Sequence, residues 1–142
     1  MGSTAVDLRS DTVTQATAEM RRAMAEAAVG DDGREGDPTA QKLEARAAEL
    51  TGHEAALFCS SGTMGNLVSC MCHLRPGEEV IAEKDSHFLR LESGGITAIV
   101  GAIPRTLAGR AGRMDLDQLA GEIHPGNRHR PRPRTAGWPP GS

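Results

Sequence analysis

The chain has 142 residues, of which 38% are hydrophobic and only 2% aromatic, with a formal net charge of −3. This length allows one modest domain whose core is built mainly from small aliphatic side chains. Four arginines and no acidic residue give residues 126–142 a charge of +4, so residues 1–125 carry the difference, −7. An acidic body of this kind is not typical of a nucleic-acid-binding protein.

The cysteines and the N-terminus indicate the cellular compartment of the protein. There are three cysteines, Cys59, Cys70 and Cys72, and an odd number favours a reducing compartment over a disulfide framework. Residues 1–12 carry charges early and lack the apolar stretch of a secretory signal. No apolar run approaches the length of a membrane span. We therefore expect a cytoplasmic protein that binds no membrane.

Two helices are predicted in the first third of the chain. Thr17 can cap a helix over about residues 18–28, which Gly30 can end. A loop rich in glycine and aspartate follows. Asp37 and Pro38 then mark a second helix, over about 38–51, because proline is favoured at the first helical position.

The middle of the chain predicts an alternation of strands and helices. The apolar run at residues 55–59 fits a buried strand, residues 63–74 an amphipathic helix and residues 79–82 a second strand. Together they form a β-α-β unit. Residues 96–103 could be another strand, and Asp115 begins a last helix with a capping pattern.

The pattern changes after Pro125. Residues 126–142 contain four prolines and four arginines and show neither a helical nor a strand period. A segment of this composition cannot bury enough apolar surface to offset its ordering entropy. We therefore expect one folded part, residues 1–125, and an Arg/Pro-rich disordered tail, residues 126–142.

The stretch SSGT at residues 60–63 is a candidate anion site. A turn from a strand into a helix points free backbone amides outward, and the helix dipole adds partial positive charge there. Ser61 and Thr63 add hydroxyl donors, and Gly62 allows close approach, so phosphate is the natural ligand. The alternative is a plain capped helix, since neither the Rossmann fingerprint nor the P-loop is present.

Two further polar candidates lie outside this stretch. His87 follows the strand 79–82, where ligands gather in open α/β sheets, and it could stack on a flat ring or move a proton. The alternative is a surface or half-buried histidine. Ser10 belongs to a polar cluster with Asp11 and Thr12, which in isolation reads as a turn or cap.

A metal site is not predicted. Cys70, Cys72 and His73 lie close together, but within one helix residues i and i+2 face different ways. No second pair completes a four-ligand zinc site. We therefore interpret these three residues as packing residues.

Five spaced motifs occur in an order that resembles one family. They are VDLRSDTVTQAT, VGDD..EGDPT, EAALFCSSGTMGNL, RPGEEVI and DSHFLRLESGG. Together they resemble the N-terminal part of the low-specificity L-threonine aldolases, over about residues 6–125. The resemblance implies pyridoxal 5'-phosphate (PLP) as cofactor. It also implies an incomplete three-layer α/β/α major domain of the aspartate-aminotransferase (PLP-transferase) fold.

The resemblance also implies roles for particular residues. Ser61, Gly62 and Thr63 would hold the cofactor phosphate, and His87 would stack on the pyridine ring near the substrate hydroxyl as a catalytic residue. Ser10 would lie near the substrate carboxylate. The reaction would cleave L-threonine or L-allo-threonine, a small amino-acid substrate, to glycine and acetaldehyde. Full-length members of the family are homo-oligomers.

The sequence departs from the family in two respects. Arg34 stands where the family has a tyrosine that serves the cofactor site of a neighbouring subunit. The Schiff-base lysine, the aspartate that pairs with the pyridine nitrogen and the arginine that holds the substrate carboxylate lie beyond the matching region. The two lysines of this chain, Lys42 and Lys84, do not match that lysine.

We therefore expect no significant aldolase activity from this chain alone. Two alternatives remain open. One is a non-catalytic module that binds phosphate or PLP reversibly. The other is a fragment that pairs with full-length aldolase subunits.

Overall fold

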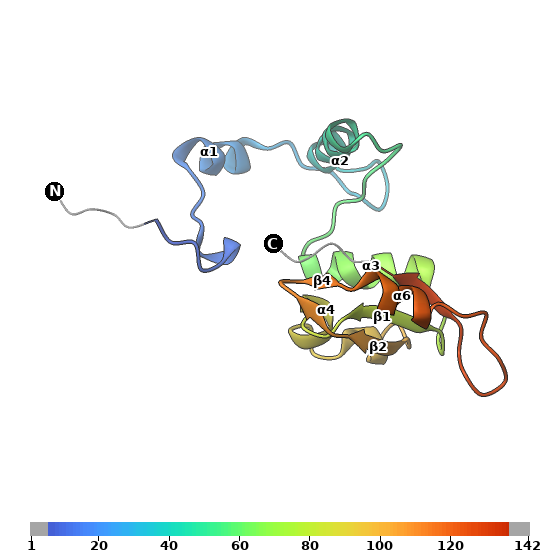
Figure 1. The fold of residues 1–142 in the computed structure, drawn as a ribbon. Coiled ribbons are helices and arrows are strands. Elements are labelled where there is room, and N and C mark those ends of the chain that lie inside the picture. The colour runs from blue at the N-terminus through green and yellow to red at the C-terminus, as the bar shows by residue number, and fades with distance from the viewer. Residues whose placement is uncertain (1–5, 137–142) are drawn as a thin grey trace. The chain divides into compact units, whose positions relative to one another are not determined.

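The computed structural model describes residues 6–136, which form two compact units divided between Phe58 and Cys59 (Figure 1). Unit 1, up to Phe58, contains a 3₁₀ turn and two helices. They are η1 (Asp11–Val13), α1 (Ala18–Glu26) and α2 (Pro38–Thr51). Unit 2, from Cys59 onward, contains all the strands among the described residues.

The ends of α2 follow from its sequence. Asp37 accepts hydrogen bonds from the backbone amides of Thr39 and Ala40, at 2.9 and 2.8 Å, and Pro38 occupies the first turn. Gly52 closes the helix in the left-handed conformation, with φ 68°, which glycine adopts without steric cost. The helix predicted over 38–51 is thereby confirmed.

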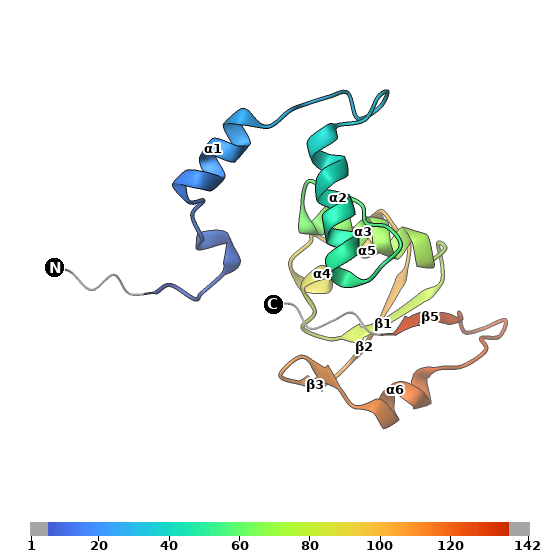
Figure 2. The same ribbon diagram turned by 90° about the horizontal axis from the view of Figure 1, so that it is seen from above.

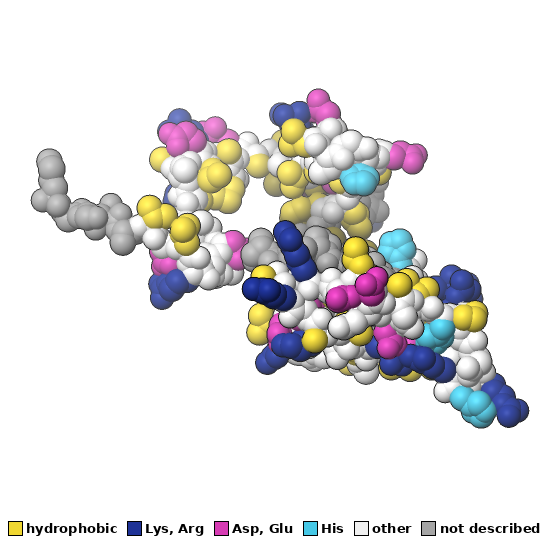
Figure 3. Space-filling model, in the orientation of Figure 1, with side chains coloured by type: hydrophobic (Ala, Val, Ile, Leu, Met, Phe, Trp, Pro, Cys, Tyr) yellow, Lys and Arg dark blue, Asp and Glu magenta, His cyan; other side chains and the backbone are white. Residues whose placement is uncertain are grey.

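The first helix is shorter than predicted and buries little. Thr17 caps α1 as expected, but the helix ends at Glu26, before Gly30. Met20 and Met24, predicted on one face, are 58% and 65% exposed. Among residues 6–58 only Ala48 is buried, and hydrophobic side chains appear on the surface of both helices (Figure 3).

Unit 2 begins with α3 and the central strand β1, and its other elements follow along the chain. Their bounds are α3 Gly62–His73, β1 Glu79–Glu83, α4 His87–Arg90, α5 Gly95–Ala98, β2 Ile103–Leu107, β3 Gly109–Arg110, β4 Arg113–Met114, α6 Leu116–Glu122 and β5 Pro133–Ala136. Asp115 caps α6 by accepting from the amides of Asp117 and Gln118, so the predicted start of this helix is confirmed.

The main sheet of unit 2 is parallel, in the order β2-β1-β5. Helices α3, α4 and α5 lie on one side of it and α6 on the other (Figure 2). A separate antiparallel pair, β3 and β4, turns through Ala111 and Gly112, both at positive φ. This arrangement is part of a three-layer α/β/α fold, as the sequence predicted.

The side chains of β1 alternate between two buried faces. Val80 and Ala82 join a cluster contributed largely by the three helices on one side. The other members of that cluster are Cys70, Leu74, Phe88, Ile96, Val100 and Ala102. On the opposite face, the buried carboxylate of Glu79 receives two hydrogen bonds from Arg105, at 2.6 and 3.0 Å.

Two strand predictions are wrong. Residues 55–59 form no strand, and Leu57 and Phe58 are 69% and 53% exposed. No strand among the described residues pairs with this run, so its backbone groups lack the ladder that would stabilise it. Residues 96–103 form part of α5 and only the first residue of β2, because a short apolar run does not distinguish helix from strand.

The C-terminal segment also differs from the prediction. Pro133–Ala136 forms β5 and pairs with β1, although we expected disorder from residue 126 onward. Proline is compatible with the first residue of an edge strand. Arg134 bonds Glu78 at 2.9 Å and Arg130 bonds Glu122 at 2.7 Å, so acidic residues of the body hold this segment. The predicted disorder of residues 137–142 lies outside the described residues.

Candidate cofactor-binding site

Ser61 is the N-cap of α3. Its hydroxyl accepts a hydrogen bond from the Met64 amide at 3.1 Å, and its carbonyl accepts one from the Gly65 amide at 3.0 Å. The hydroxyl therefore performs the local capping that a plain helix start requires. Its proton remains available for donation, because a hydroxyl can donate and accept at the same time.

The turn before α3 also has room for a ligand. A Cβ atom placed on Gly62 would meet no atom within 4 Å, so the space above this residue is open. Gly62 and Thr63 are the first two residues of α3, a helix of 12 residues. The first amides of a helix have no partner within it, and the helix dipole favours an anion beside them. The geometry thus fits an anion site as well as a cap.

His87 lies where the sequence placed it, after the C-terminal end of β1 and at the first residue of α4. Its side chain is 59% exposed, so the ring is accessible from solvent. Its Nδ1 lies 2.9 Å from Oε1 of Glu92. His87 is therefore an exposed ring with one nitrogen held by a carboxylate.

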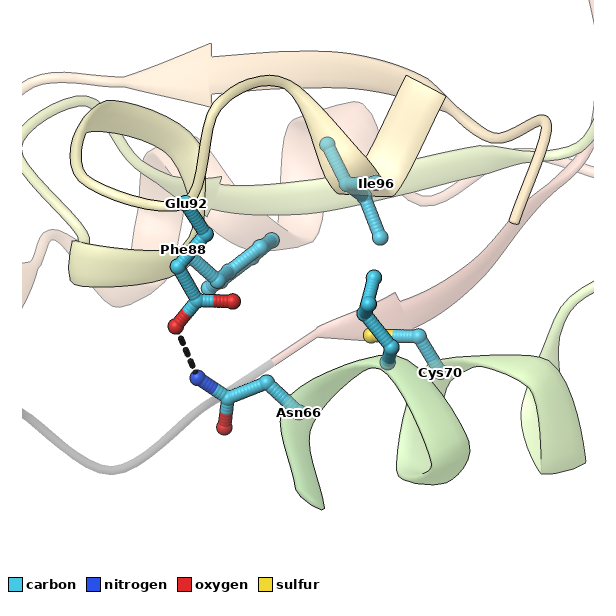
Figure 4. Close-up of a pocket in the computed structure, with 6 residues that line it drawn as sticks. Asn66, Cys70, Phe88, Glu92 and Ile96 are labelled. Carbon is cyan, nitrogen blue, oxygen red and sulfur yellow. Dashed lines mark hydrogen bonds between the residues drawn. The ribbon is translucent and has the colours of Figure 1, made fainter. Parts of the chain in front are cut away.

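Glu92 is a residue of the candidate site that was not predicted from the sequence. Its side chain is 1% exposed, and its Oε1 also accepts a hydrogen bond from Nδ2 of Asn66 at 2.5 Å (Figure 4). A spacing of five residues from His87 is not a helical contact. The chain reverses through Ser93 and Gly94, at φ 53° and 73°, directly after Glu92, whose carboxylate contacts Asn66 of α3. The positive φ at Ser93 could not be read from the sequence.

Asn66 connects the two parts of the site. It lies in α3, one turn beyond Gly62, and its hydrogen bond to Glu92 reaches the segment that carries His87. The N-terminal turn of α3 and the histidine are therefore linked by one chain of hydrogen bonds, from Asn66 through Glu92 to His87.

The surroundings of Glu92 are apolar. A small cavity is lined by Asn66, Leu67, Cys70, Phe88, Glu92 and Ile96. Burial raises the pKa of the Cys70 thiol, and the charge of Glu92 raises it further. Cys70 is therefore an un-ionised packing residue, as predicted, whereas the same prediction is wrong for Cys72 and His73, which are exposed. Among residues 6–136, no group of three histidine, cysteine or acidic side chains is placed to hold a metal ion.

Ser10 lies in unit 1, whereas the other four predicted site residues lie in unit 2. It caps η1, and its hydroxyl oxygen is 3.2 Å from the Thr12 amide and 2.8 Å from the Thr12 hydroxyl. Its local role is thus the cap that the sequence allowed. Arg34, at the family's tyrosine position, is exposed and lies 3.7 Å from Asp31.

The two lysines occupy ordinary structural positions. Lys42 belongs to α2, and Lys84 follows β1, where it pairs with Asp85.

Within the part of the chain that the structure describes, no helix is long and apolar enough to cross a bilayer.

Comparison with known proteins places these features in a family. The family of beta-eliminating lyases matches residues 7–136. The low-specificity L-threonine aldolase 1 of Arabidopsis thaliana is 49% identical over 83% of this chain and 34% of its own length. The low specificity L-threonine aldolase of Escherichia coli strain K12 is 44% identical over 87% of this chain and 38% of its own length.

A solved structure agrees with the sequence comparison. A threonine aldolase of Leishmania major superposes with a TM-score of 0.65 and 29% identity, over 81% of this chain and 33% of that chain. The chain spans about a third of the length of these relatives, between 33% and 38%. The match to the beta-eliminating lyases continues to residue 136, beyond the predicted boundary at 125.

Proposed function

This chain belongs to the beta-eliminating lyase family, and we propose that it is the portion of a PLP-dependent L-threonine aldolase that binds the cofactor phosphate and covers its ring. The proposal is carried by the hydrogen-bonded link from α3 through Asn66 and Glu92 to His87. This link joins an open anion site to an exposed imidazole.

The residues present fit PLP. The unfilled space above Gly62, at the start of a 12-residue helix, suits a phosphate group. Ser61 and Thr63 would donate hydroxyl hydrogen bonds to that phosphate. Bound PLP would supply an electron sink for the bond that is broken in the substrate. The imidazole of His87 would lie against the cofactor ring and accept the proton of the substrate hydroxyl, and Ser10 would bind the substrate carboxylate.

Binding of PLP tests the phosphate site directly. In equilibrium dialysis, Thr63→Val should weaken PLP binding roughly tenfold, the usual effect of losing a hydrogen bond to a charged group. Ser69→Ala changes a hydroxyl in the same helix, two turns from its start, and serves as the matched control. Equal affinity of the Thr63→Val variant and the unaltered chain would exclude the phosphate site at this turn.

We further propose that these 142 residues do not cleave threonine by themselves. Catalysis through PLP requires a lysine amine to anchor the cofactor covalently. Neither Lys42 nor Lys84 matches the family's lysine, and Lys84 is paired with Asp85. With PLP and L-threonine present, we expect no acetaldehyde above the protein-free rate. Release of acetaldehyde at a rate proportional to the concentration of the chain would refute this.

A second candidate, pairing with full-length aldolase subunits, is favoured by the exposed apolar side chains of unit 1. Leu43 and Leu50 of α2 are 52% and 68% exposed, and Leu57 is 69% exposed. Covering such side chains is what a partner subunit would do. Co-purification with a tagged full-length threonine aldolase, lost in a Leu43→Ser/Leu50→Ser variant, would support pairing.

We place the chain in the cytoplasm, where its three free cysteines would stay reduced.

A further inference from the structure

Glu92 is a buried carboxylate with an uneven set of partners. Its Oε1 receives two hydrogen bonds, from Asn66 and His87, whereas its Oε2 is buried and has no hydrogen-bond partner among the described residues. The side chain is 1% exposed and lies among the apolar residues Leu67, Phe88 and Ile96.

Such a carboxylate is not explained by stability. Removing a carboxylate from water is costly, and buried ionic groups can often be replaced by apolar residues of similar size without loss of stability. Its one organised oxygen is directed at an exposed imidazole. Its effect on the molecule is therefore expected to act through the imidazole ring of His87.

We propose that Glu92 is a positioning residue, which holds His87 with its ring proton on Nδ1 and leaves Nε2 as the basic nitrogen. The inference rests on the proposed function in one respect, that His87 is the imidazole of the active site.

The tautomer follows from the chemistry of the contact. An ionised carboxylate only accepts hydrogen bonds, so the ring nitrogen 2.9 Å from Oε1 must donate. In the neutral ring the other nitrogen, Nε2, then carries no proton and can accept one. Without a partner on Nδ1, a neutral histidine ring places its proton preferentially on Nε2, so the carboxylate reverses the ordinary preference.

Two features hold the carboxylate itself in place. Asn66 donates to the same oxygen from α3, and the left-handed residues Ser93 and Gly94 fix the backbone directly after Glu92. On the segment of His87, the carboxylate of Asp85 pairs with Lys84 and Arg90. From α3, the thiol of Cys70 lies near Glu92 and is neutral.

Nitrogen-15 NMR of the histidine rings tests the proposal in the full 142-residue chain, without cofactor or substrate. Long-range proton–nitrogen spectra distinguish the two neutral tautomers, and His87→Asn identifies the His87 signal. We expect the Nδ1-protonated form to predominate in the unaltered chain in alkaline solution, where the ring is neutral. A predominance of the Nε2-protonated form, or the mixture shown by an unstructured peptide, would overturn the proposal whatever the variants do.

Variants separate positioning from a structural role. Glu92→Leu removes the acceptor, and the ratio of the Nδ1-protonated to the Nε2-protonated form should fall roughly tenfold or more while the circular dichroism spectrum is retained. Glu92→Gln keeps a neutral acceptor of the same shape and should give a smaller fall. Asp85→Asn, which removes a carboxylate from the same segment, should leave the ratio unchanged. An unchanged ratio in a folded Glu92→Leu variant would refute the proposal.

These readouts involve no PLP, so failure of the positioning role and failure of the proposed function can be told apart. A chain with the expected tautomer but no PLP binding would retain Glu92 as a positioning residue and lose the cofactor assignment.

Discussion

At the scale of single residues, Asp37 combines two tasks. One carboxylate oxygen caps α2, and the other accepts a hydrogen bond from the Gly30 amide at 2.9 Å, across the loop between the helices. These backbone donors lower the pKa of Asp37, with the Ala40 amide contributing most. The ionised form is therefore the one that the folded loop favours.

The stability of α2 should therefore depend on pH through the ionisation of one side chain, Asp37. Because the folded pKa is lowered, the stabilisation is complete above about pH 4, the ordinary aspartate value, and is lost as the pH falls through the folded pKa. We expect the helical circular dichroism signal to decrease in this range. Asp37→Asn still caps the helix but cannot titrate, so its signal should decrease less. Identical acid profiles for the two proteins would contradict the assignment.

The predictability of the site also differed residue by residue. His87 and the SSGT turn were evident from position along the chain, because a strand end and a helix start leave recognisable patterns. Glu92 and Asn66 could not be predicted, since their contact joins residues 26 apart in the sequence and Glu92 directly precedes a turn with two positive φ angles. A five-residue spacing carries no periodic signal.

At the scale of elements, the ion pair between β1 and β2 is the polar contact that organises one face of the sheet. Glu79 is 2% exposed, and Arg105 holds its pKa below the usual range through two hydrogen bonds. Arg105 also lies 3.5 Å from Glu122 of α6, which in turn binds Arg130. The pair thereby ties the sheet to the helix layer beneath it.

Removing one partner of this pair should be more harmful than removing both. Arg105→Met leaves the Glu79 carboxylate buried without its fork of donors, and we expect a loss of about 3–5 kcal/mol in the free energy of unfolding. The double variant Glu79→Gln/Arg105→Met has no buried charge to compensate and should recover part of that loss. Urea unfolding followed by circular dichroism measures both. A double variant less stable than Arg105→Met would show that the charge is not the cause.

Element prediction succeeded where local chemistry sets the boundaries. Thr17, Asp37 and Asp115 each cap a helix as expected, because capping involves only neighbouring residues. It failed at residues 55–59 and 96–103, where a strand depends on partners distant in the sequence. It also failed at β5, whose order comes from pairing with β1 and from the ion pair of Arg134 with Glu78, while Arg130 just before the strand pairs with Glu122.

At the scale of the whole molecule, the two units differ in how much they bury. Among its described residues, unit 2 has a cluster of eight buried hydrophobic residues around β1, whereas only Ala48 is buried among residues 6–58. Local opening is least costly where few apolar contacts must be broken. The two units should therefore exchange their amide protons at different rates.

Hydrogen exchange followed by mass spectrometry can compare them within one sample. We expect peptides of α1 and α2 to exchange at least roughly tenfold faster than those of β1, because their opening exposes less apolar surface. The four-residue helices of unit 2 provide an internal control for element length. Equal protection of the amides of α2 and β1 from exchange would mean that contacts outside this chain bury part of unit 1 and stabilise it.

The edges of the parallel sheet carry a proline each. Ile103 donates its amide to Glu78, and Arg132 presents its carbonyl to Glu79, so the ring nitrogens of Pro104 and Pro133 are directed away from β1. A proline has no backbone N–H group, so a strand added at either edge would have one carbonyl with no amide to accept a hydrogen bond from. The sheet therefore discourages growth by further copies of itself, as natural edge strands do. Pro104→Val and Pro133→Val would restore those donors and open a path to fibres.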